Sequence, residues 1–286
     1  MGNKRYKIIA DSCADMQCEQ VKPEDFTLIP LTLQVDDTII TDDETFNQGE
    51  FLELVKNSKS CPKSACPSPD TYMRAYEGEE EMVFVVTLSK KLSGSYNSAL
   101  VGKDMYHEEI SEDKKIHVFS SDSASGGETL VALKIKDLCE AGFTFEEIVE
   151  QTEKYINEMR TYFVLENLDF LKKNGRLTGV ASLIVDVLNI RPVMSATEGE
   201  IIKLNQARGV NKALKMMGDI IEKEVMEKRL DPAKRRIAIT YCNCYNRALE
   251  VKNMMCEKMS YLDVVLIPTA GVSSLYAGDG GIIVAI

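Results

Sequence analysis

Short apolar runs alternate with helical segments along the first half of the chain, and this alternation constrains the fold most strongly. Three runs, at 6–10, 82–87 and 116–120, are rich in apolar residues and bounded by polar ones, as buried strands are. Helical segments at about 94–106 and 126–141 follow the second and third runs. Repeated strand–helix units are typical of a parallel sheet with helices on its faces. The sequence therefore predicts an α/β protein.

The remaining elements are predicted from the same kinds of pattern. In the first half we expect a single strand over 28–35, a pairing strand at 38–40, a helix from an N-cap at Thr45 to about Ser58, and a loop over Cys61–Pro69, whose three prolines disfavour a regular element. Further along we expect helices at 144–159, 167–173, 180–187, from 210, and between 242 and 262, and strands at 161–165, 190–195, 200–206, 236–242, 262–267 and 282–286. A hairpin turn at Glu198-Gly199-Glu200 joins the strands at 190–195 and 200–206.

The distribution of charge suggests two lobes. The 286 residues carry a net charge of −11. Residues 1–160 hold 17 basic and 31 acidic side chains, whereas residues 161–286 hold 17 and 14. We expect an N-terminal lobe at 1–160 with a parallel, Rossmann-like sheet, and a C-terminal α/β lobe at 161–286. The basic excess of the second lobe suits a protein partner, although an ordinary solvated surface explains it equally well.

Composition disfavours several classes of function. The negative net charge disfavours a nucleic-acid partner. No apolar run approaches the ~20 residues of a membrane span, and the first residues lack the apolar segment of a signal peptide, so we expect a cytoplasmic protein. The eight cysteines have C-x4-C and C-x-C spacings rather than the paired C-x2-C of a zinc site. We therefore expect reduced thiols and no metal.

Serine hydroxyls gather where the predicted strands end. Ser12, Ser93 with Ser95, and Ser123 with Ser125 each follow a strand, and Ser64 lies on the proline-rich segment. The ends of parallel strands share one edge of a sheet, where ligands bind. Hydroxyls that converge there suit an oxygen-rich group such as a carboxylate or phosphate. The alternative is turn and N-cap chemistry, which explains each serine singly. Asp11 and Asp15 either cap the first turn or line a cleft.

These hydroxyls do not form the pattern of a nucleophilic enzyme. A serine nucleophile needs a base within hydrogen-bond reach, and the two histidines, His107 and His117, lie outside the polar loops. The G-x-S-x-G elbow of hydrolases is missing from the sequence. The glycines of Asp122–Gly127 match neither a dinucleotide-binding fingerprint nor a Walker loop.

An ordered set of motifs across nearly the whole chain resembles the DegV family of bacterial fatty acid-binding proteins. The motifs are IIADSCADM near the start, KSACPSP at 63–69, LSGSYNSA at 92–99, DSASGGE at 122–128, LDFLKKNGRLTG at 168–179 and RPVMSATEGEI at 191–201, followed by Arg208. Each motif alone is weak, but their order is specific.

The resemblance implies a two-lobed α/β fold, shared with dihydroxyacetone kinases, that buries a long-chain fatty acid. It implies a carrier rather than an enzyme, one that presents the carboxylate to a separate fatty acid kinase and uses no cofactor. By position, Ser64 and Ser93 would hold the carboxylate. The other expected ligand-binding residues are Ser12, Gly94, Ser95, Asn97, Ser123, Ser125, Gly126, Arg176 and Tyr276. Arg176 and Arg208 match basic positions near the ligand exit and the kinase-docking face.

Two positions depart from the family pattern. Ser64 stands where the family commonly has threonine, a change that keeps the hydroxyl. Tyr276 stands where many relatives have a histidine, and Asp279 where they have a proline. A phenol can donate a hydrogen bond to a carboxylate, but it does not become a cation as an imidazole does.

Two other classes of function stay open on the sequence. A lipid-transport or regulatory protein would bind the fatty acid without a kinase partner, and the residues hardly distinguish it from a carrier. A phosphotransferase related to dihydroxyacetone kinases would need phosphate and metal ligands, and the sequence shows no clear carboxylate cluster on the predicted rim.

Overall fold

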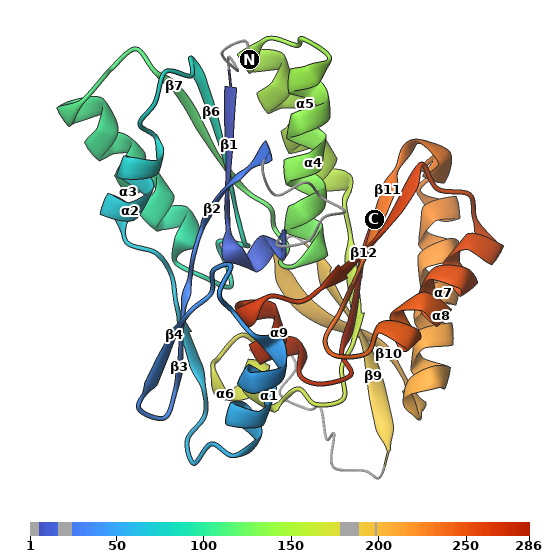
Figure 1. The fold of residues 1–286 in the computed structure, drawn as a ribbon. Helices are drawn as coiled ribbons and strands as arrows, with labels where there is room; N and C mark the ends of the chain where they lie inside the picture. Colours follow the sequence, from blue (N-terminus) through green and yellow to red (C-terminus); the bar gives the residue numbers. More distant parts are fainter. Residues whose placement is uncertain (1–5, 17–24, 178–188, 198) are drawn as a thin grey trace.

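Helices and sheets alternate in layers across the computed structural model, which describes residues 6–16, 25–177, 189–197 and 199–286 (Figure 1). The strands are β1 (Tyr6–Asp11), β2 (Thr27–Ile29), β3 (Thr32–Val35), β4 (Thr38–Thr41), β5 (Lys63–Ala65), β6 (Met82–Thr87), β7 (Lys115–Ser120), β8 (Thr161–Val164), β9 (Ile190–Thr197), β10 (Glu200–Arg208), β11 (Arg236–Tyr241), β12 (Asp263–Pro268) and β13 (Ile282–Ala285). The α-helices are α1 (Gln48–Lys56), α2 (Pro69–Ala75), α3 (Ser95–Glu109), α4 (Gly126–Glu140), α5 (Phe145–Glu158), α6 (Asp169–Lys173), α7 (Val210–Glu227), α8 (Tyr245–Lys258) and α9 (Gly271–Ala277), and short 3-10 turns are η1 (Ser12–Ala14) and η4 (Pro232–Lys234).

The first sheet is parallel and has the order β2-β1-β6-β7. Successive side chains of a strand point to opposite faces. Ile8 and Ala10 of β1 therefore pack with α4 and α5 on one face, whereas Ile9 packs with α2 and α3 on the other. The predicted α/β class with a parallel sheet is confirmed.

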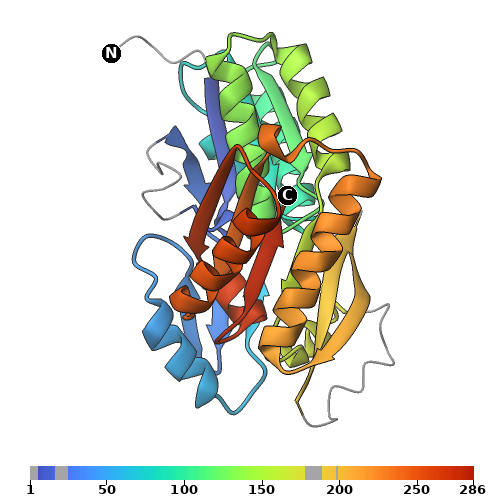
Figure 2. The same ribbon diagram turned by 90° about the vertical axis from the view of Figure 1, so that its right-hand side faces the viewer.

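The second sheet is mixed and has the order β10-β9-β8-β13-β11-β12. Only its β11–β12 pair is parallel, and the others are antiparallel. Figure 2 shows α7 and α8 lying across its outer face, where they pack on Tyr162, Ile239 and Val284. Helix α4 packs against the inner face as well as against the first sheet, because the core around it includes Ala238 and Ile267. The two sheets thus share one helical layer.

A small antiparallel sheet, β4-β3-β5, lies beside the junction of the two larger sheets, together with α1, α6 and α9 (Figure 1). Its core joins residues far apart in the chain, since Leu33 of β3 packs with Val272 and Leu275 of α9. This small sheet and α9 form one wall of the site described below.

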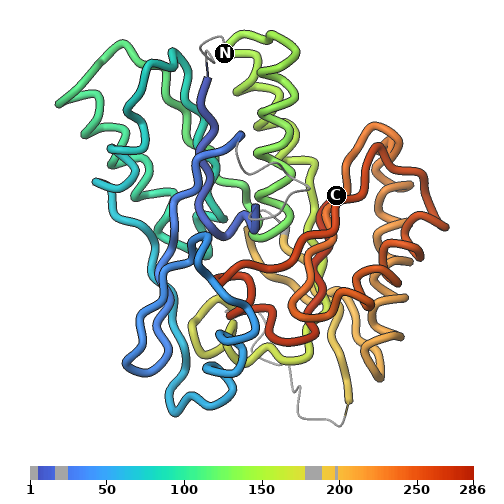
Figure 3. Tube along the Cα trace, viewed as in Figure 1, coloured from blue at the N-terminus to red at the C-terminus, as the bar shows by residue number. Residues whose placement is uncertain are grey.

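The chain enters the second sheet between α5 and β8, and its C-terminal end returns to the same place (Figure 3). Arg160 and Ile286 exchange two backbone hydrogen bonds, of 2.9 and 3.0 Å. All strands of the first sheet precede residue 160, and all strands of the second follow it. The boundary between residues 160 and 161 is still a prediction, because α4 packs on both sheets.

Three predicted elements need correction. The expected single strand over 28–35 is two strands, β2 and β3, which belong to different sheets and are separated at Pro30, whose nitrogen carries no hydrogen to donate. Helix α1 begins at Gln48 rather than after Thr45, because the Asn47 side chain accepts the hydrogen bond from the Glu50 amide. The Thr45 hydroxyl instead donates to Asp43.

The expected loop over Cys61–Pro69 contains strand β5, which pairs with β3. Its prolines flank the three paired residues and therefore remove no hydrogen bond from the ladder. The expected helix at 180–187 lies outside the described residues, as does Glu198 of the predicted hairpin turn. Strands β9 and β10 on either side of that turn pair antiparallel, as predicted. Within the described ranges, no helix combines the length and hydrophobicity needed to cross a bilayer.

Candidate ligand-binding site

A cavity of about 330 Å³ lies where the carboxyl ends of the first sheet meet the second sheet. Residues that follow β1, β6 and β7 line one side of it, as the rule for parallel sheets predicts. Most of its wall is apolar and comes from the second sheet, α6, α9 and the segments that follow strands: Leu31, Leu88, Leu92, Phe163, Leu165, Leu171, Ile201, Val272 and Ile283. Its volume lies in the range of small-molecule sites, ~300–1000 Å³.

A group of polar side chains forms the partly exposed end of this cavity. Ser64 from β5 and Tyr276 from α9 contact each other, with 3.0 Å between Oγ and the phenol oxygen. The Arg176 guanidinium lies over the Tyr276 ring, 5.7 Å from its centroid. Ser93 precedes α3, and its hydroxyl accepts a hydrogen bond from the Ser95 amide. We call Ser64, Ser93, Arg176 and Tyr276 the polar cluster; all four line the cavity and are half-buried.

The polar cluster carries an uncompensated positive charge. Arg176 donates hydrogen bonds to the backbone carbonyls of Leu92, at 3.3 Å, and Asn174, at 2.7 Å. Among the described residues, no carboxylate forms an ion pair with it. The carbonyls and the Tyr276 ring hold the guanidinium in place without neutralising it, so the cluster favours an anionic ligand group.

The start of α3 adds to this preference. The helix begins at Ser95, has no acidic residue in its first turn, and has no side-chain cap. Gly94, its N-cap, lines the cavity beside Ser93. The Ser95 amide already donates to Ser93, but the helix dipole and the later amides of the first turn still favour negative charge.

A second group of hydroxyls lines the buried part of the cavity, and each already forms a hydrogen bond within the protein. Ser123 and Thr161 share a hydrogen bond of 2.6 Å between their hydroxyls. Ser125 donates to Asp15 at 2.6 Å, which steadies a backbone with φ of 59° at the start of α4. Ser273 donates to the Cys13 carbonyl at 3.5 Å. Ser123 therefore links the end of β7 to β8 as well as lining the cavity, whereas Ser125 links the start of α4 to the turn after β1.

Four of the residues expected from the sequence do not line the cavity. Ser12 is buried, where it donates to Asp42 and accepts from the Leu31 amide. Ser95 contacts Ser93, and Asn97 is exposed on α3. These three are placed to support or flank the cluster rather than to face the cavity.

Gly126, the fourth, lies where α4 approaches β11. A Cβ on it would stand 2.6 Å from the Thr240 hydroxyl oxygen and 2.8 Å from the Ala238 Cβ. The lack of a side chain at Gly126 therefore allows α4 to pack closely on the second sheet. Arg208, at the end of β10, is exposed and also lies outside the cavity lining.

Buried aspartates fix the parts of the wall to one another. Asp42 accepts hydrogen bonds from the Gly271 and Val272 amides, at 2.6 and 2.9 Å, and so caps the helix that carries Tyr276. Asp15 accepts from the Ala270 amide at 2.7 Å. Burial raises the pKa of Asp15 to about 7 even though the Ser125 and Ala270 hydrogen bonds lower it. Burial likewise raises the pKa of Asp42.

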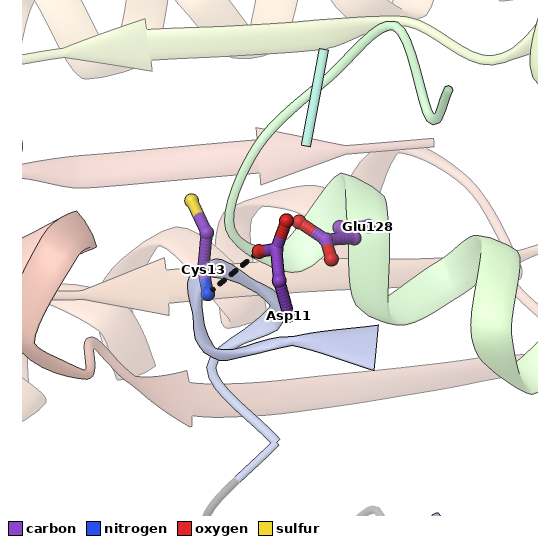
Figure 4. A group of neighbouring side chains, drawn as sticks. All are labelled: Asp11, Cys13 and Glu128. Carbon is purple, nitrogen blue, oxygen red and sulfur yellow. Dashed lines mark hydrogen bonds between the residues drawn. The ribbon is translucent and has the colours of Figure 1, made fainter. Parts of the chain in front are cut away.

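Asp11 and Glu128 form a buried carboxyl pair next to Cys13 (Figure 4). Asp11 accepts hydrogen bonds from the Cys13 and Leu88 amides, both at 3.1 Å, whereas the Glu128 oxygens have no donor from another described residue. Burial, followed by the nearby Asp11 charge, raises the pKa of Glu128 well above its ordinary value. The raised pKa favours the protonated form of Glu128, and a protonated carboxyl group at this place can donate a hydrogen bond to Asp11.

The same three side chains are the group of described residues whose spacing would suit a metal ion, since their ligand atoms lie within 4.8 Å of one another. Their protonation opposes this use. Burial raises the pKa of the Cys13 thiol and, to about 7, that of Asp11, whereas metal ligands must be deprotonated. The described cysteines are all free thiols.

Sequence reasoning did not identify the apolar wall or two thiols in it. Phe163 and Ile283 read as ordinary strand residues, because a cavity-facing side chain has the same alternation as a core-facing one. Cys13 and Cys66 also line the cavity, and Cys66 is exposed. Both cysteines lie inside motifs that carry the family resemblance, and these motifs were the signal that could have identified them as lining residues.

The fold and site define a class: an α/β binding protein with an apolar cavity that ends in a cationic, hydroxyl-rich cluster. The sequence profile of the DegV family, described as uncharacterised proteins, matches residues 5–286. The chain belongs to the DegV family. A DegV domain-containing protein of Streptococcus pneumoniae is 37% identical over 281 residues, which cover 97% of each chain.

Solved structures of related proteins share the fold over nearly their whole length. A DegV family protein from Ruminococcus gnavus, described with vaccenic acid, has a TM-score of 0.94 and 46% identity, covering 99% of this chain and 100% of that one. The fatty acid kinase B3 protein of Streptococcus pneumoniae, loaded with linoleic acid, has a TM-score of 0.86 and 36% identity, covering 98% of each chain. A DegV family protein from Eubacterium eligens, loaded with heptadecanoic acid, has a TM-score of 0.87 and 26% identity, again covering 98% of each.

Proposed function

We propose that this protein binds one long-chain fatty acid, with its acyl chain in the apolar cavity and its carboxylate at the polar cluster. The observation that carries the proposal is the Arg176 guanidinium, which lines a largely apolar cavity and has no acidic partner among the described residues. An amphipathic anion matches both features of such a site. The similar proteins described with vaccenic, linoleic and heptadecanoic acids support this choice of ligand.

The energetics suit binding of the acyl chain by the apolar wall and of the carboxylate by the polar cluster. Each buried methylene contributes about 0.8 kcal/mol, so a chain of roughly 15 methylenes contributes on the order of 12 kcal/mol before costs. Lost ligand freedom and desolvation of the carboxylate reduce that figure substantially. Ser64, Ser93 and Tyr276 offer hydroxyl donors, and Arg176 offers charge, so the carboxylate would not be left unpaired.

We propose that this chain is a carrier, which presents its ligand to a separate fatty acid kinase and does not itself catalyse the reaction. The polar cluster lies at the partly exposed end of the cavity, where a second protein can reach the carboxylate. The similar protein from Streptococcus pneumoniae is named for a fatty acid kinase. His107 and His117 do not line the cavity: His107 contacts the Lys114 carbonyl, and His117 lies 3.5 Å from Glu153.

A comparison of a fatty acid with the fatty alcohol of the same chain tests the proposal. Delipidated protein is titrated with each ligand by calorimetry. We expect both to bind and the acid to bind more tightly, because only the acid uses the Arg176 charge. Arg176→Met should remove most of the difference, whereas Arg208→Met, an equal loss of charge outside the cavity, should preserve it. Equal affinities for acid and alcohol in the wild type would refute the head-group assignment, and failure of both to bind would refute the function.

A further inference from the structure

A second cavity, of about 480 Å³, shares no lining residue with the first. It lies between α4 and α5 on one side and the segments that lead into β11 and β12 on the other. Five of its lining residues are cationic and three are acidic: Lys134, Lys154, Lys234, Arg235 and Arg236, with Asp137, Glu158 and Asp231. We call it the basic cavity.

The three acids of the basic cavity are already neutralised. Asp137 accepts hydrogen bonds from both terminal nitrogens of Arg236, and the bond from Nη2 is 3.1 Å long. Glu158 pairs with Arg235, and Asp231 lies 3.5 Å from Lys234. The first two of these pairs join α4 and α5 to the second sheet.

Two lysines are left over after this pairing. Lys134 on α4 and Lys154 on α5 have no ion-pair partner within the described ranges, although both line the same cavity. Positive charge held in a concave site without counter-charge attracts anions. Two such cations match a dianion better than a single carboxylate.

Arg235, which also lines the basic cavity, has a hydrogen-bond donor without an acceptor among the described residues. Its side chain is 11% exposed and stacks on Tyr155, with 5.8 Å to the ring centroid. Its Nη1 is buried and has no hydrogen-bond partner among the described residues. Buried donors are rarely left without an acceptor, because the lost solvation costs free energy. Arg235 lines the basic cavity, so an oxygen of a bound ligand is a candidate acceptor for this guanidinium.

The rest of the wall favours an organic ligand over a bare ion. Leu130, Tyr155 and Leu262 give the cavity an apolar side. A cavity of 480 Å³ is large for inorganic phosphate and lies within the ~300–1000 Å³ range of small-molecule sites.

We propose that the basic cavity binds a phosphomonoester. Lys134, Lys154 and Arg235 hold the phosphate oxygens, and the organic part of the ligand lies against Leu130, Tyr155 and Leu262. The phosphomonoester is either a soluble metabolite or the phosphate of a lipid headgroup, since both offer the same dianion. The site is separate from the fatty acid cavity, so it would give the protein a second ligand.

Calorimetry with phenyl phosphate, and flotation with vesicles of phosphatidylcholine with or without phosphatidic acid, test this proposal. The variant is Lys134→Ala/Lys154→Ala, and the matched control is Lys103→Ala/Lys212→Ala, which loses the same charge from α3 and α7. Thermal unfolding and fatty acid affinity are measured for both variants.

We expect the wild type and the control to bind, and the test variant to bind about tenfold more weakly with unchanged fatty acid affinity. Binding of phenyl phosphate identifies a soluble ligand, and binding only to phosphatidate vesicles identifies a lipid surface. If the wild type binds neither phenyl phosphate nor phosphatidate vesicles, the proposal is overturned. An equal loss in the control variant also overturns it, because the effect would then reflect net charge rather than this cavity.

Discussion

Ser64 and Tyr276 are 212 positions apart in the sequence, yet their side-chain oxygens lie 3.0 Å from each other. Ser64 belongs to the small antiparallel sheet, and Tyr276 belongs to α9 near the chain end. Asp42, which follows β4, caps α9 through the Gly271 and Val272 amides. The polar cluster is thus positioned jointly by the small sheet and the C-terminal helix.

Removing the Tyr276 phenol should weaken fatty acid binding moderately. Tyr276→Phe keeps the ring under the Arg176 guanidinium and deletes only the hydroxyl that contacts Ser64. A neutral hydrogen bond is worth ~0.5–1.5 kcal/mol, so we expect roughly a two- to tenfold rise in the dissociation constant. Calorimetric titration measures it, with Tyr245→Phe on the exposed start of α8 as the control. An affinity equal to that of the wild type would show that the contact between Ser64 and Tyr276 does not help to hold the carboxylate.

Deleting the two serine hydroxyls should have a larger effect. A hydrogen bond to a charged group is worth ~1.5–3 kcal/mol, so Ser64→Ala and Ser93→Ala should each weaken binding by about tenfold or more. Both residues are half-buried and neither lies in a core cluster, so the unfolding temperature should change little. Ser68→Ala is the matched control, because Ser68 caps α2 and does not line the cavity. If the double variant binds as tightly as wild type, these serines are not the carboxylate clamp.

Arg208 should affect the kinase reaction and leave ligand binding intact. It is exposed at the end of β10 and outside the cavity lining. We expect Arg208→Ala to lower the rate at which a fatty acid kinase phosphorylates the bound acid, with little change in fatty acid affinity. Acyl-phosphate formation and calorimetry on the same sample separate the two effects. A loss of affinity with normal phosphorylation would assign Arg208 to the ligand instead.

The buried carboxyl groups should make the protein less stable as pH rises. Asp11 and Asp15, each with a pKa raised to about 7 by burial, and Glu128 hold protons in the folded state that the unfolded chain releases near pH 4. The native state therefore binds more protons above pH 4, and the free energy of unfolding falls by ~1.4 kcal/mol per pH unit for each such proton until the folded group titrates.

Glu128→Gln tests this dependence, because an amide can donate to Asp11 without requiring a proton from solution. We expect the variant to lose less stability than the wild type between pH 5 and pH 8 in urea denaturation, compared with Glu250→Gln on the exposed face of α8. A pH profile that matches the wild type would mean that Glu128 is not protonated in the folded protein.

The sequence predicted the parallel sheet because its strands are buried on both faces, so apolar runs such as 82–87 stand out. It also placed Ser93 and Ser123 at strand ends, where the cavity lies. It could not reveal that Pro30 separates strands of two different sheets, since sheet membership depends on long-range pairing. Nor could it reveal the lack of an acidic partner for Arg176, which depends on side chains brought together from distant segments.

Other hydroxyls show that residue type alone does not predict which serines line the cavity. Ser12 and Ser95 have the same local pattern as Ser93, yet Ser12 is enclosed by Asp42 and the Leu31 amide. Turn chemistry and ligand binding use the same residues, and only the three-dimensional arrangement separates them. The family resemblance supplied the position of Tyr276, and the structure supplied its contact with Ser64.

Mass spectrometry of lipid extracted from the purified protein tests the central claim most directly. The account predicts one long-chain fatty acid per protein molecule, retained through purification because the acyl chain is buried in the cavity. An extract without an acyl chain, from protein that also fails to take up added fatty acid, would contradict it.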